Sequence, residues 1–252
     1  MFFGGVYEML LACLRPIEQL IEGFKTGAGV PQSAYPDATY EAMARFSNGW
    51  YENLLLPLWI PGAGLHDRLA DGIEVADVGC GRGPALIKMA EAYPRSRFVG
   101  YDAYGPNIAK ARQRAERAGV AGRVRFVELD AARGLPESAD LVTTFDVVHD
   151  AVDPPALLGA IRGALRPGGR YLCLEINGSE RLEDMIGPAG TFFHTASLLY
   201  CMPSSLAGGG AGLGACGLHE PKLRALADQA GFAAVERVPI DDPFSAIYLL
   251  SV

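Results

Sequence analysis

The sequence lacks the features that mark several classes of protein. Its 252 residues include five cysteines, an odd number, and no two of them form a C-x-x-C pair. This usage argues against a structural zinc site and a disulfide scaffold and suits a reducing compartment, so we expect no bound metal. Lysine and arginine form no run, and the formal net charge is -7. An acidic protein repels phosphate backbones, so nucleic acids are not expected as partners.

Long apolar runs are also missing. Residues 1–14 are largely apolar, but Glu8 interrupts them and no basic region precedes them, so they neither span a membrane nor form a targeting signal. We therefore expect a cytoplasmic protein without a membrane partner. A hydrophobic fraction of 50% and a charged fraction of 20% indicate one sizeable core and no disorder.

The first 70 residues have a helical pattern. Apolar residues recur at helical spacing over residues 6–24 and form one stripe, and further helices are predicted near 40–48 and 51–59. We interpret residues 1–70 as a helical N-terminal cap. Its apolar stripe would pack on the core or on a second subunit, so a homodimer is expected.

From residue 71 to residue 252, predicted strands alternate with helices. The strands are expected at 73–78, 97–101, 124–129, 140–145, 170–176, 235–238 and 246–250. This alternation predicts an α/β fold with a Rossmann-like, doubly wound, seven-stranded and mostly parallel sheet. It stops at about residues 177–218, where we expect a lid insertion. The glycine run at 208–214 in that insertion would be a mobile loop or a tight backbone wall.

A glycine loop follows the first predicted strand. Gly79, Gly81 and Gly83 allow the backbone to approach a ligand, and the helix that follows offers unpaired N–H groups. The dinucleotide pattern G-x-G-x-x-G needs its third glycine where this sequence has Pro84, which disfavours a dehydrogenase. The remaining readings are a site for a nucleotide-like ligand and a glycine turn without a ligand.

Acidic residues end the next strands of the predicted sheet. Asp102 follows the glycines by about twenty residues, where such folds bind ribose hydroxyls, although capping of the next turn is an alternative. Asp130 ends the third strand and Asp146 the fourth. Because the carboxyl ends of parallel strands share one edge of the sheet, these groups are expected around one ligand.

Together these residues resemble those of class I S-adenosylmethionine-dependent methyltransferases. The resemblance covers residues 73–252 and is carried by residues 77–83, Asp102, Asp130, Asp146 and residues 165–169. A closer similarity, through residues 24–31, 147–150, 200–206, 231–232 and 242–244, is to a bacterial branch in which a winged-helix domain often precedes this region. That domain is absent here, so the sequence would begin within the linking helices, as a short member or a truncation, and DNA-related roles are not expected.

The resemblance implies the cofactor, S-adenosylmethionine, its product S-adenosylhomocysteine, and the residues that bind them. The glycine loop would approach the methionine and ribose, and Asp77 would face the ammonium group. Asp102 would bind the ribose diol, while Asp130 and the Ala131 N–H would read the adenine edge. The full expected set is Asp77, Gly79, Cys80, Gly81, Gly83, Asp102, Ala103, Asp130, Ala131, Phe145 and Asp146.

Methyl transfer depends mostly on positioning and on exclusion of water, and a hydroxyl acceptor also benefits from a general base such as histidine. His149, beside the expected methyl position, and His194, in the insertion, are the candidate catalytic residues and would also contact the substrate. The alternatives are a helix-start histidine and a core histidine. Tyr35, Tyr40 and Tyr200 are the other candidate substrate contacts, with ordinary aromatic packing as the alternative.

We therefore predict methyl transfer to a small, partly aromatic or apolar acceptor, with oxygen as the first choice of atom. The acidic charge and the aromatic residues of the insertion favour this reading. A cofactor-binding sensor or subunit that transfers nothing, and methylation of a protein or an RNA, are the alternatives.

Overall fold

The computed structural model describes residues 4–252, so residues 1–3 of the predicted cap lie outside the described part. Its centre is a seven-stranded sheet with the order β3-β2-β1-β4-β5-β7-β6. The strands are β1 (Glu74–Val78), β2 (Arg97–Asp102), β3 (Val124–Glu128), β4 (Ala139–Phe145), β5 (Leu165–Ile176), β6 (Ala234–Arg237) and β7 (Ser245–Ser251). Only β7 runs antiparallel to its neighbours, which confirms the predicted mostly parallel sheet.

Strand β5 begins earlier than its predicted start at Arg170. Leu165 pairs with Ala139, and after an irregularity in register Leu141 pairs with Arg170. The turn residues between Leu165 and Arg170 bulge out of the ladder. The sequence pattern alone presented these residues as a loop before the strand.

Both faces of the sheet are buried. Helices α6 (Pro84–Ala92) and α7 (Gly105–Arg117) pack on one face, and helices α8 (Pro154–Ala164) and α11 (Glu220–Ala230) pack on the other. Alternate residues of one strand serve the two cores: Val75 belongs to the first and Ala76 to the second. Burial on both sides explains the continuous apolar runs of these strands.

The N-terminal cap consists of α1 (Gly4–Cys13), α2 (Ile17–Thr26) and α3 (Asp37–Trp50), followed by a π-helical segment (Tyr51–Trp59), α4 (Ile60–Gly62) and α5 (His66–Asp71). The helix predicted over residues 6–24 is therefore two helices. Pro16 separates them because proline lacks an N–H and its ring clashes with the preceding turn. No described helix is long and apolar enough to cross a membrane.

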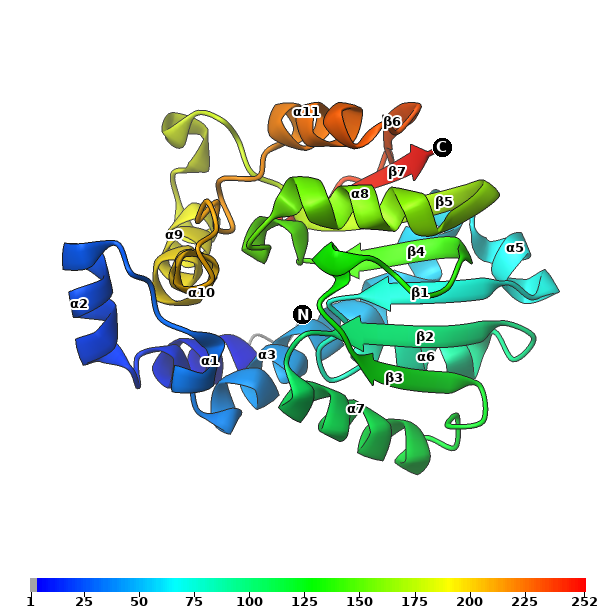
Figure 1. The fold of residues 1–252 in the computed structure, drawn as a ribbon, viewed down its shortest axis with the longest axis horizontal. Coiled ribbons are helices and arrows are strands. Elements are labelled where there is room, and N and C mark those ends of the chain that lie inside the picture. Colours follow the sequence, from blue (N-terminus) through cyan, green and yellow to red (C-terminus); the bar gives the residue numbers. More distant parts are fainter. Residues whose placement is uncertain (1–3) are drawn as a thin grey trace.

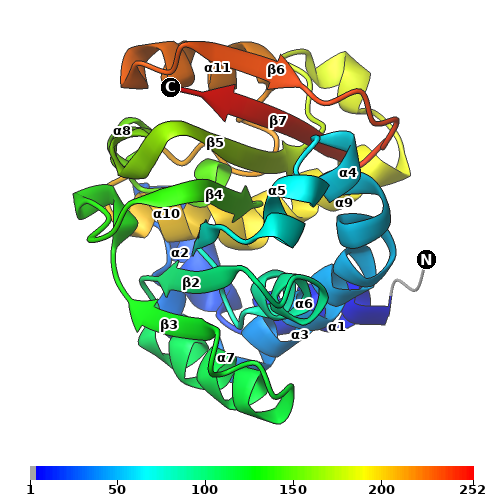
Figure 2. The ribbon, with the colours of Figure 1, turned by 90° about the vertical axis from the view of Figure 1, so that its right-hand side faces the viewer.

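The insertion faces the cap across the carboxyl edge of the sheet. It holds α9 (Pro188–Ala196), a π-helical segment (Ser197–Cys201) and α10 (Met202–Ala207). In Figure 1 the arrowheads of the parallel strands point towards the cap and the insertion, and Figure 2 shows the same arrangement from the side. The Val30 N–H donates to the Pro203 carbonyl at 2.9 Å, which ties the two segments together.

The glycine run of the insertion is a packed backbone wall, the second of its two predicted forms. A Cβ at Gly210 would lie 2.5 Å from the Ser205 hydroxyl oxygen, and one at Gly214 would collide with Ser197. Glycine is therefore needed for close packing at these two positions.

Candidate active site

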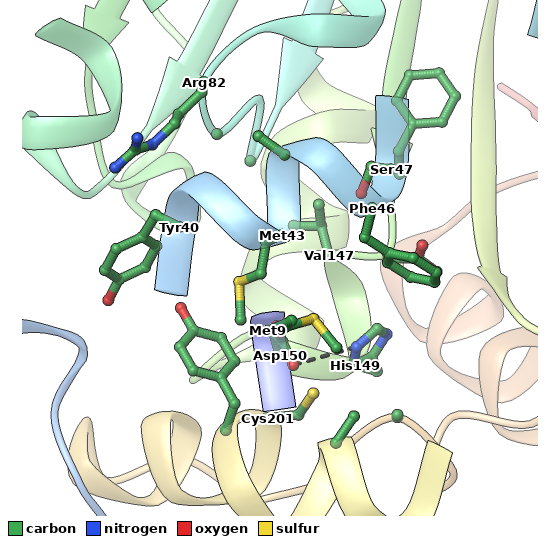
Figure 3. Close-up of a pocket in the computed structure, with 18 of the residues that line it drawn as sticks. Met9, Tyr40, Met43, Phe46, Ser47, Arg82, Val147, His149, Asp150 and Cys201 are labelled. Carbon is green, nitrogen blue, oxygen red and sulfur yellow. Dashed lines mark ion pairs between the residues drawn. The ribbon is translucent and has the colours of Figure 1, made fainter. Parts of the chain in front are cut away.

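A cavity of about 290 Å³ lies between the carboxyl edge of the sheet, the cap and the insertion. Its lining combines the glycine loop after β1, the ends of β2 and β4, one face of α3, and the aromatic residues of the insertion. Segments that are far apart in the sequence therefore meet around a single space, which is drawn in Figure 3.

The glycine loop and Asp102 form one side of the cavity. The Gly81 N–H donates to Asp102 Oδ2 at 2.8 Å, and Asp102 Oδ1 accepts from the Tyr104 N–H at 2.9 Å. Gly79 has a positive φ of 69°, and a Cβ there would lie 2.6 Å from the Val147 side chain. Nothing lies within 4 Å of the Cβ position of Gly81, which leaves its backbone open on one side. The loop is thus held in shape while Gly81 stays accessible to a ligand.

Two further carboxylates lie at this edge. Asp77 is buried, and its Oδ1 accepts from the Thr143 hydroxyl at 2.7 Å; burial raises its pKa to about 7. Asp146 opens onto the cavity from a left-handed backbone conformation, with a φ of 57°, which is uncommon for a residue other than glycine. Its carboxylate is exposed to the cavity, but desolvation by the surrounding protein, together with the charge of Glu175, raises its pKa to about 7.

His149 lies between two further carboxylates of the cavity, and one of its ring nitrogens is within 4.8 Å of the Asp146 carboxylate. Its Nδ1 is 2.5 Å from Glu175 Oε2, and its Nε2 is 3.2 Å from Asp150 Oδ1. The second oxygen of Glu175 accepts from the Val148 N–H at 2.7 Å, so both carboxylate oxygens have a partner. Burial alone would lower the pKa of His149, but Asp150 and Glu175 outweigh it and raise that pKa well above the usual value.

Sequence reasoning missed Glu175, although a signal for it was present. It lies near the end of β5 and therefore at the same edge as Asp102 and Asp146, where acidic residues had been singled out. The predicted strand 170–176 contains it, but the 1% exposed carboxylate becomes explicable only beside His149.

Apolar and aromatic side chains complete the cavity. Tyr40, Met43 and Phe46 project from α3 at spacings of three residues, so they share a face of the helix. Phe192 of α9 packs against Phe46 with 5.6 Å between ring centroids, and Tyr200 lies 6.2 Å from Tyr40. The helical spacing could have revealed Met43 and Phe46, but only the fold shows which face they occupy.

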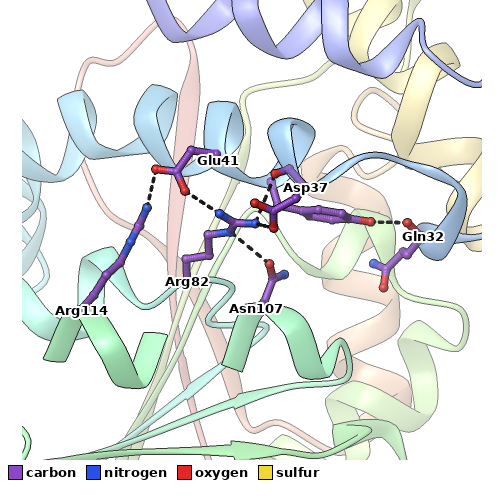
Figure 4. A network of polar contacts seen from close by, with 7 residues as sticks. Gln32, Asp37, Glu41, Arg82, Asn107 and Arg114 are labelled. Atoms are coloured by element: carbon purple, nitrogen blue, oxygen red, sulfur yellow. Dashed lines mark hydrogen bonds and ion pairs between the residues drawn. The ribbon is translucent and has the colours of Figure 1, made fainter. Parts of the chain in front are cut away.

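A second missed residue, Arg82, joins the glycine loop to the cap (Figure 4). Arg82 is only 2% exposed, and its guanidinium pairs with Glu41 at 2.5 Å and with Asp37, both on α3. Its Nε also donates to Asn107 Oδ1 at 3.4 Å, and Arg114 pairs with Glu41 at 2.8 Å. The helix that carries Tyr40 and Met43 is thereby tied to the loop after β1.

Comparison with known proteins agrees with this arrangement. A family model described as a methyltransferase domain matches residues 69–197. The chain belongs to this family. The predicted class I S-adenosylmethionine-dependent methyltransferase, with its Rossmann-like fold, is thereby confirmed.

Curated relatives of this methyltransferase share part of its length. Ubiquinone biosynthesis O-methyltransferases of Cereibacter sphaeroides (strain KD131 / KCTC 12085) and Dinoroseobacter shibae are each 35% identical to it, over 107 and 106 residues. Each match covers 42% of this chain and 42% of the relative, so the chain matches less than half of those proteins.

Solved structures resemble the methyltransferase over almost its whole length. An O-methyltransferase family protein from Burkholderia thailandensis has a TM-score of 0.74 at 18% identity and covers 99% of this chain and 72% of its own. An O-methyltransferase from neocarzinostatin biosynthesis has a TM-score of 0.66 at 21% identity, covers 99% of this chain and 70% of its own, and was solved with S-adenosyl-L-homocysteine and 1,4-dihydroxy-2-naphthoic acid. At these identities the likeness concerns the fold.

The structure brings many of the predicted site residues of this methyltransferase to the cavity, and it places others elsewhere. The cavity lining includes Gly79, Cys80, Gly81, Asp102, Phe145, Asp146, Tyr40, His149 and Tyr200. It does not include Asp77, Gly83, Ala103, Asp130 or Ala131, which lie beneath or beside the loops at the same edge. Exposed Asp130 caps the short turn after β3 by accepting from the Ala132 N–H.

Tyr35 and His194 are also placed away from the cavity lining. The Tyr35 hydroxyl donates to the Leu199 carbonyl at 2.8 Å, so this buried residue ties the cap to the insertion. His194 sits half-buried on α9, with its Nε2 unpartnered among the described residues. Tyr35 therefore packs the cap on the insertion, which was the alternative considered for it.

The donor atoms of His149, Asp150 and Cys201 lie within 4.8 Å of one another. The ion pairs of His149 with Asp150 and Glu175 already account for this cluster, and we assign no metal to it.

Proposed function

We propose that this methyltransferase transfers the methyl group of S-adenosylmethionine to a hydroxyl oxygen of a small, apolar or aromatic molecule. The observation that supports this most directly is that His149, paired with Glu175, opens onto the same cavity as the glycine loop and the aromatic side chains. The names of the curated relatives and the naphthoic acid bound to one structural neighbour also support a small hydroxylated acceptor.

The residues at the ends of β1, β2 and β4 fit S-adenosylmethionine. Gly81 offers an open backbone, and the Asp102 carboxylate beside it can accept hydrogen bonds from two neighbouring hydroxyl groups. Asp146 and, deeper, Asp77 supply negative charge for the ammonium and sulfonium groups of the cofactor. When bound, S-adenosylmethionine supplies an electrophilic methyl group on a positively charged sulfur.

His149 is assigned the role of holding the acceptor hydroxyl and taking its proton. Glu175 fixes the ring through Nδ1, which leaves Nε2 and the neighbouring Asp150 to exchange a proton with the acceptor. A positioned base of this kind contributes about 10² to 10⁴ in rate. The imidazole is 3% exposed, so the proton is exchanged within the cavity and not with bulk water.

The cap and the insertion are assigned to orient the acceptor and to exclude water. Tyr40, Met43 and Phe46 approach from α3, while Tyr200 and Phe192 approach from the insertion. Enclosure between these surfaces holds an acceptor ring in one orientation, and orientation is a major source of rate in bimolecular transfer.

Methyl-labelled S-adenosylmethionine, incubated with separate small-molecule, protein and RNA fractions of cells, tests this function. Label should enter the small-molecule fraction and disappear with Asp102→Ala, which removes a cofactor contact. The matched control Asp228→Ala, on the outer helix α11, should leave the labelling intact. Label in protein or RNA would contradict a small acceptor, and cofactor binding without transfer to any fraction would favour a cofactor-binding sensor.

We also propose that the methyltransferase is a cytoplasmic homodimer. Five free cysteines support a reducing compartment. Tyr7, Leu11 and Phe24 on α1 and α2 are 72%, 68% and 62% exposed, and such an apolar surface is suited to a second subunit. Sedimentation should give twice the monomer mass, and Leu11→Glu with Phe24→Glu should reduce it to the monomer value; a monomeric wild-type protein would contradict the dimer.

A further inference from the structure

We propose that the cavity selects acceptors without an anionic group: an uncharged phenol is preferred over the same phenol bearing a carboxylate. The inference rests on the proposed function in placing the acceptor in this cavity. It narrows that function to a substrate class on the basis of the charges that surround the cavity.

The first step concerns the charges near His149. Three carboxylates, those of Asp146, Asp150 and Glu175, lie around this one imidazole. Even with a protonated imidazole, the acids outnumber the cation. An anion placed here would meet like charge beside buried His149 and Glu175, where electrostatic interactions are screened less than in water.

The second step concerns Arg82, the other cationic side chain among the described cavity-lining residues. Both of its terminal nitrogens are engaged by acids of α3, one by Glu41 and the other by Asp37, while its Nε donates to Asn107. The side chain is 1% exposed. Its charge is thus already balanced, and its fork of donors is turned towards α3 instead of the acceptor.

The third step concerns the groups that remain for an acceptor to contact. Polar contacts near the aromatic residues come from neutral groups: the Tyr40 hydroxyl donates to the Gln32 carbonyl at 2.5 Å, and Gln32 Nε2 donates to the Tyr200 oxygen at 3.3 Å. Met43 and Phe46 add apolar surface. This lining favours an uncharged ring with neutral polar substituents, since burial of an unpaired carboxylate is costly.

Two matched pairs of acceptors test the inference: phenol with salicylate, and 2-naphthol with 3-hydroxy-2-naphthoate. Their affinities are measured on the protein saturated with S-adenosylhomocysteine at pH 8, above the pKa of about 7 of Asp146. The uncharged member of each pair should bind at least tenfold more tightly. Equal or tighter binding of the carboxylates would overturn the inference.

The same measurement separates this inference from the proposed function. Equally tight binding of the carboxylates would overturn only the preference for uncharged acceptors. Failure of all four compounds to bind, with intact binding of S-adenosylhomocysteine, would overturn the assignment of the cavity to small aromatic acceptors, and the inference with it.

Variants of Met43 give an internal check. This half-buried residue of α3 points into the cavity in Figure 3. Met43→Arg adds a permanent positive charge, and the matched control Met43→Leu keeps the side chain neutral. For each variant, the affinity for 3-hydroxy-2-naphthoate is divided by the affinity for 2-naphthol. This ratio should be at least tenfold higher in Met43→Arg than in Met43→Leu.

Asp150→Asn provides a second variant that preserves shape and does not introduce a buried charge. Removal of one of the three carboxylates should raise the relative affinity for 3-hydroxy-2-naphthoate several-fold. An unchanged ratio in both folded variants, checked by circular dichroism, would contradict an electrostatic origin of the preference.

Discussion

The two sides of the cavity are built in different ways. The cofactor side is made of short segments at the ends of neighbouring parallel strands, where one glycine loop and Asp102 lie close together by virtue of the sheet. The acceptor side is made of α3 and the insertion, which meet although more than a hundred residues separate them in the sequence. The first side follows from local pattern and topology, and the second depends on how separate helices pack.

Arg82 is the point at which the two sides meet. It belongs to the glycine loop by sequence, but its charge is balanced by Asp37 and Glu41 of the cap. The cap is therefore part of the support of the cofactor loop as well as a cover for the acceptor. The difference between the two sides can be tested by variants that affect one and spare the other.

The largest effect is expected on the acceptor side, from His149→Gln. Loss of the base should lower kcat by about 10² to 10⁴. Affinity for S-adenosylmethionine, measured by calorimetry, should change less than twofold, because the proposed cofactor contacts are made by the glycine loop, Asp102 and Asp146 and not by His149. The control His66→Gln, on α5 away from the cavity, should keep the wild-type kcat. A parallel loss of cofactor affinity in His149→Gln would show that the two sides are not separable.

Changes at the link between the sides should act mainly on stability. In Asp37→Asn with Glu41→Gln, buried Arg82 loses its counter-charges, whereas in Arg82→Met the two acids, 64% and 56% exposed, remain hydrated. Because the acids are half exposed, we expect a cost of about 1–3 kcal/mol for the acid double variant. Urea unfolding should place Arg82→Met above the acid double variant in stability.

The control for this comparison is Glu183→Gln, since Glu183 pairs with Arg181 at the surface and both side chains are more than 70% exposed. It should alter the free energy of unfolding by less than about 0.5 kcal/mol. Equal stabilities of the acid double variant and this control would mean that Arg82 does not depend on the cap.

On the cofactor side, Gly79→Ala should weaken binding of S-adenosylmethionine about tenfold and destabilise the fold by about 1–3 kcal/mol. The added Cβ would lie 2.6 Å from the Val147 side chain, at a φ of 69° that alanine disfavours. Gly122→Ala is the matched control, because nothing lies within 4 Å of its Cβ position. Wild-type cofactor affinity in Gly79→Ala would show that the loop tolerates displacement.

The smallest expected effect is a shift in the pH profile. His149 accepts a proton only when it is deprotonated, and its pKa lies well above 6.5. We therefore expect kcat/KM to rise as the pH increases above 6.5. Glu175→Gln removes one of the charges that raise this pKa, so the rise should move to lower pH, by on the order of one unit. Asp146→Asn is the control and should retain the rise in kcat/KM. Loss of the rise in this variant would assign the ionisation to Asp146 instead of His149.

Much of the cofactor side was available from the sequence. The positions of Gly79, Gly81, Asp102 and Asp146 follow from a simple rule: parallel strands end at one edge, so residues after them converge. Glu175 obeyed the same rule near the end of the predicted strand 170–176 but was overlooked. Individual strand ends were predicted to within one or two residues except for β5, whose irregular register has no signature in hydrophobic pattern.

The acceptor side was less accessible to sequence reasoning. Tyr35 and Tyr40 are near neighbours and looked equivalent, but Tyr40 lines the cavity while Tyr35 bonds to the Leu199 carbonyl. His194 was similarly indistinguishable from a cavity residue. Which face a helix presents depends on its packing against partners far away in the chain, and no local pattern contains that information.

The sequence by itself determined the alternating α/β architecture, the glycine loop and the family, because strand period, turn residues and strand-end acids are local properties. Only the tertiary structure decided that His149 lies between Glu175 and Asp150, that Arg82 is neutralised by the cap, and that the glycine run of the insertion is a packed wall. Each of these depends on charges or atoms brought together from distant segments, and electrostatic and steric interactions act through space and not along the chain.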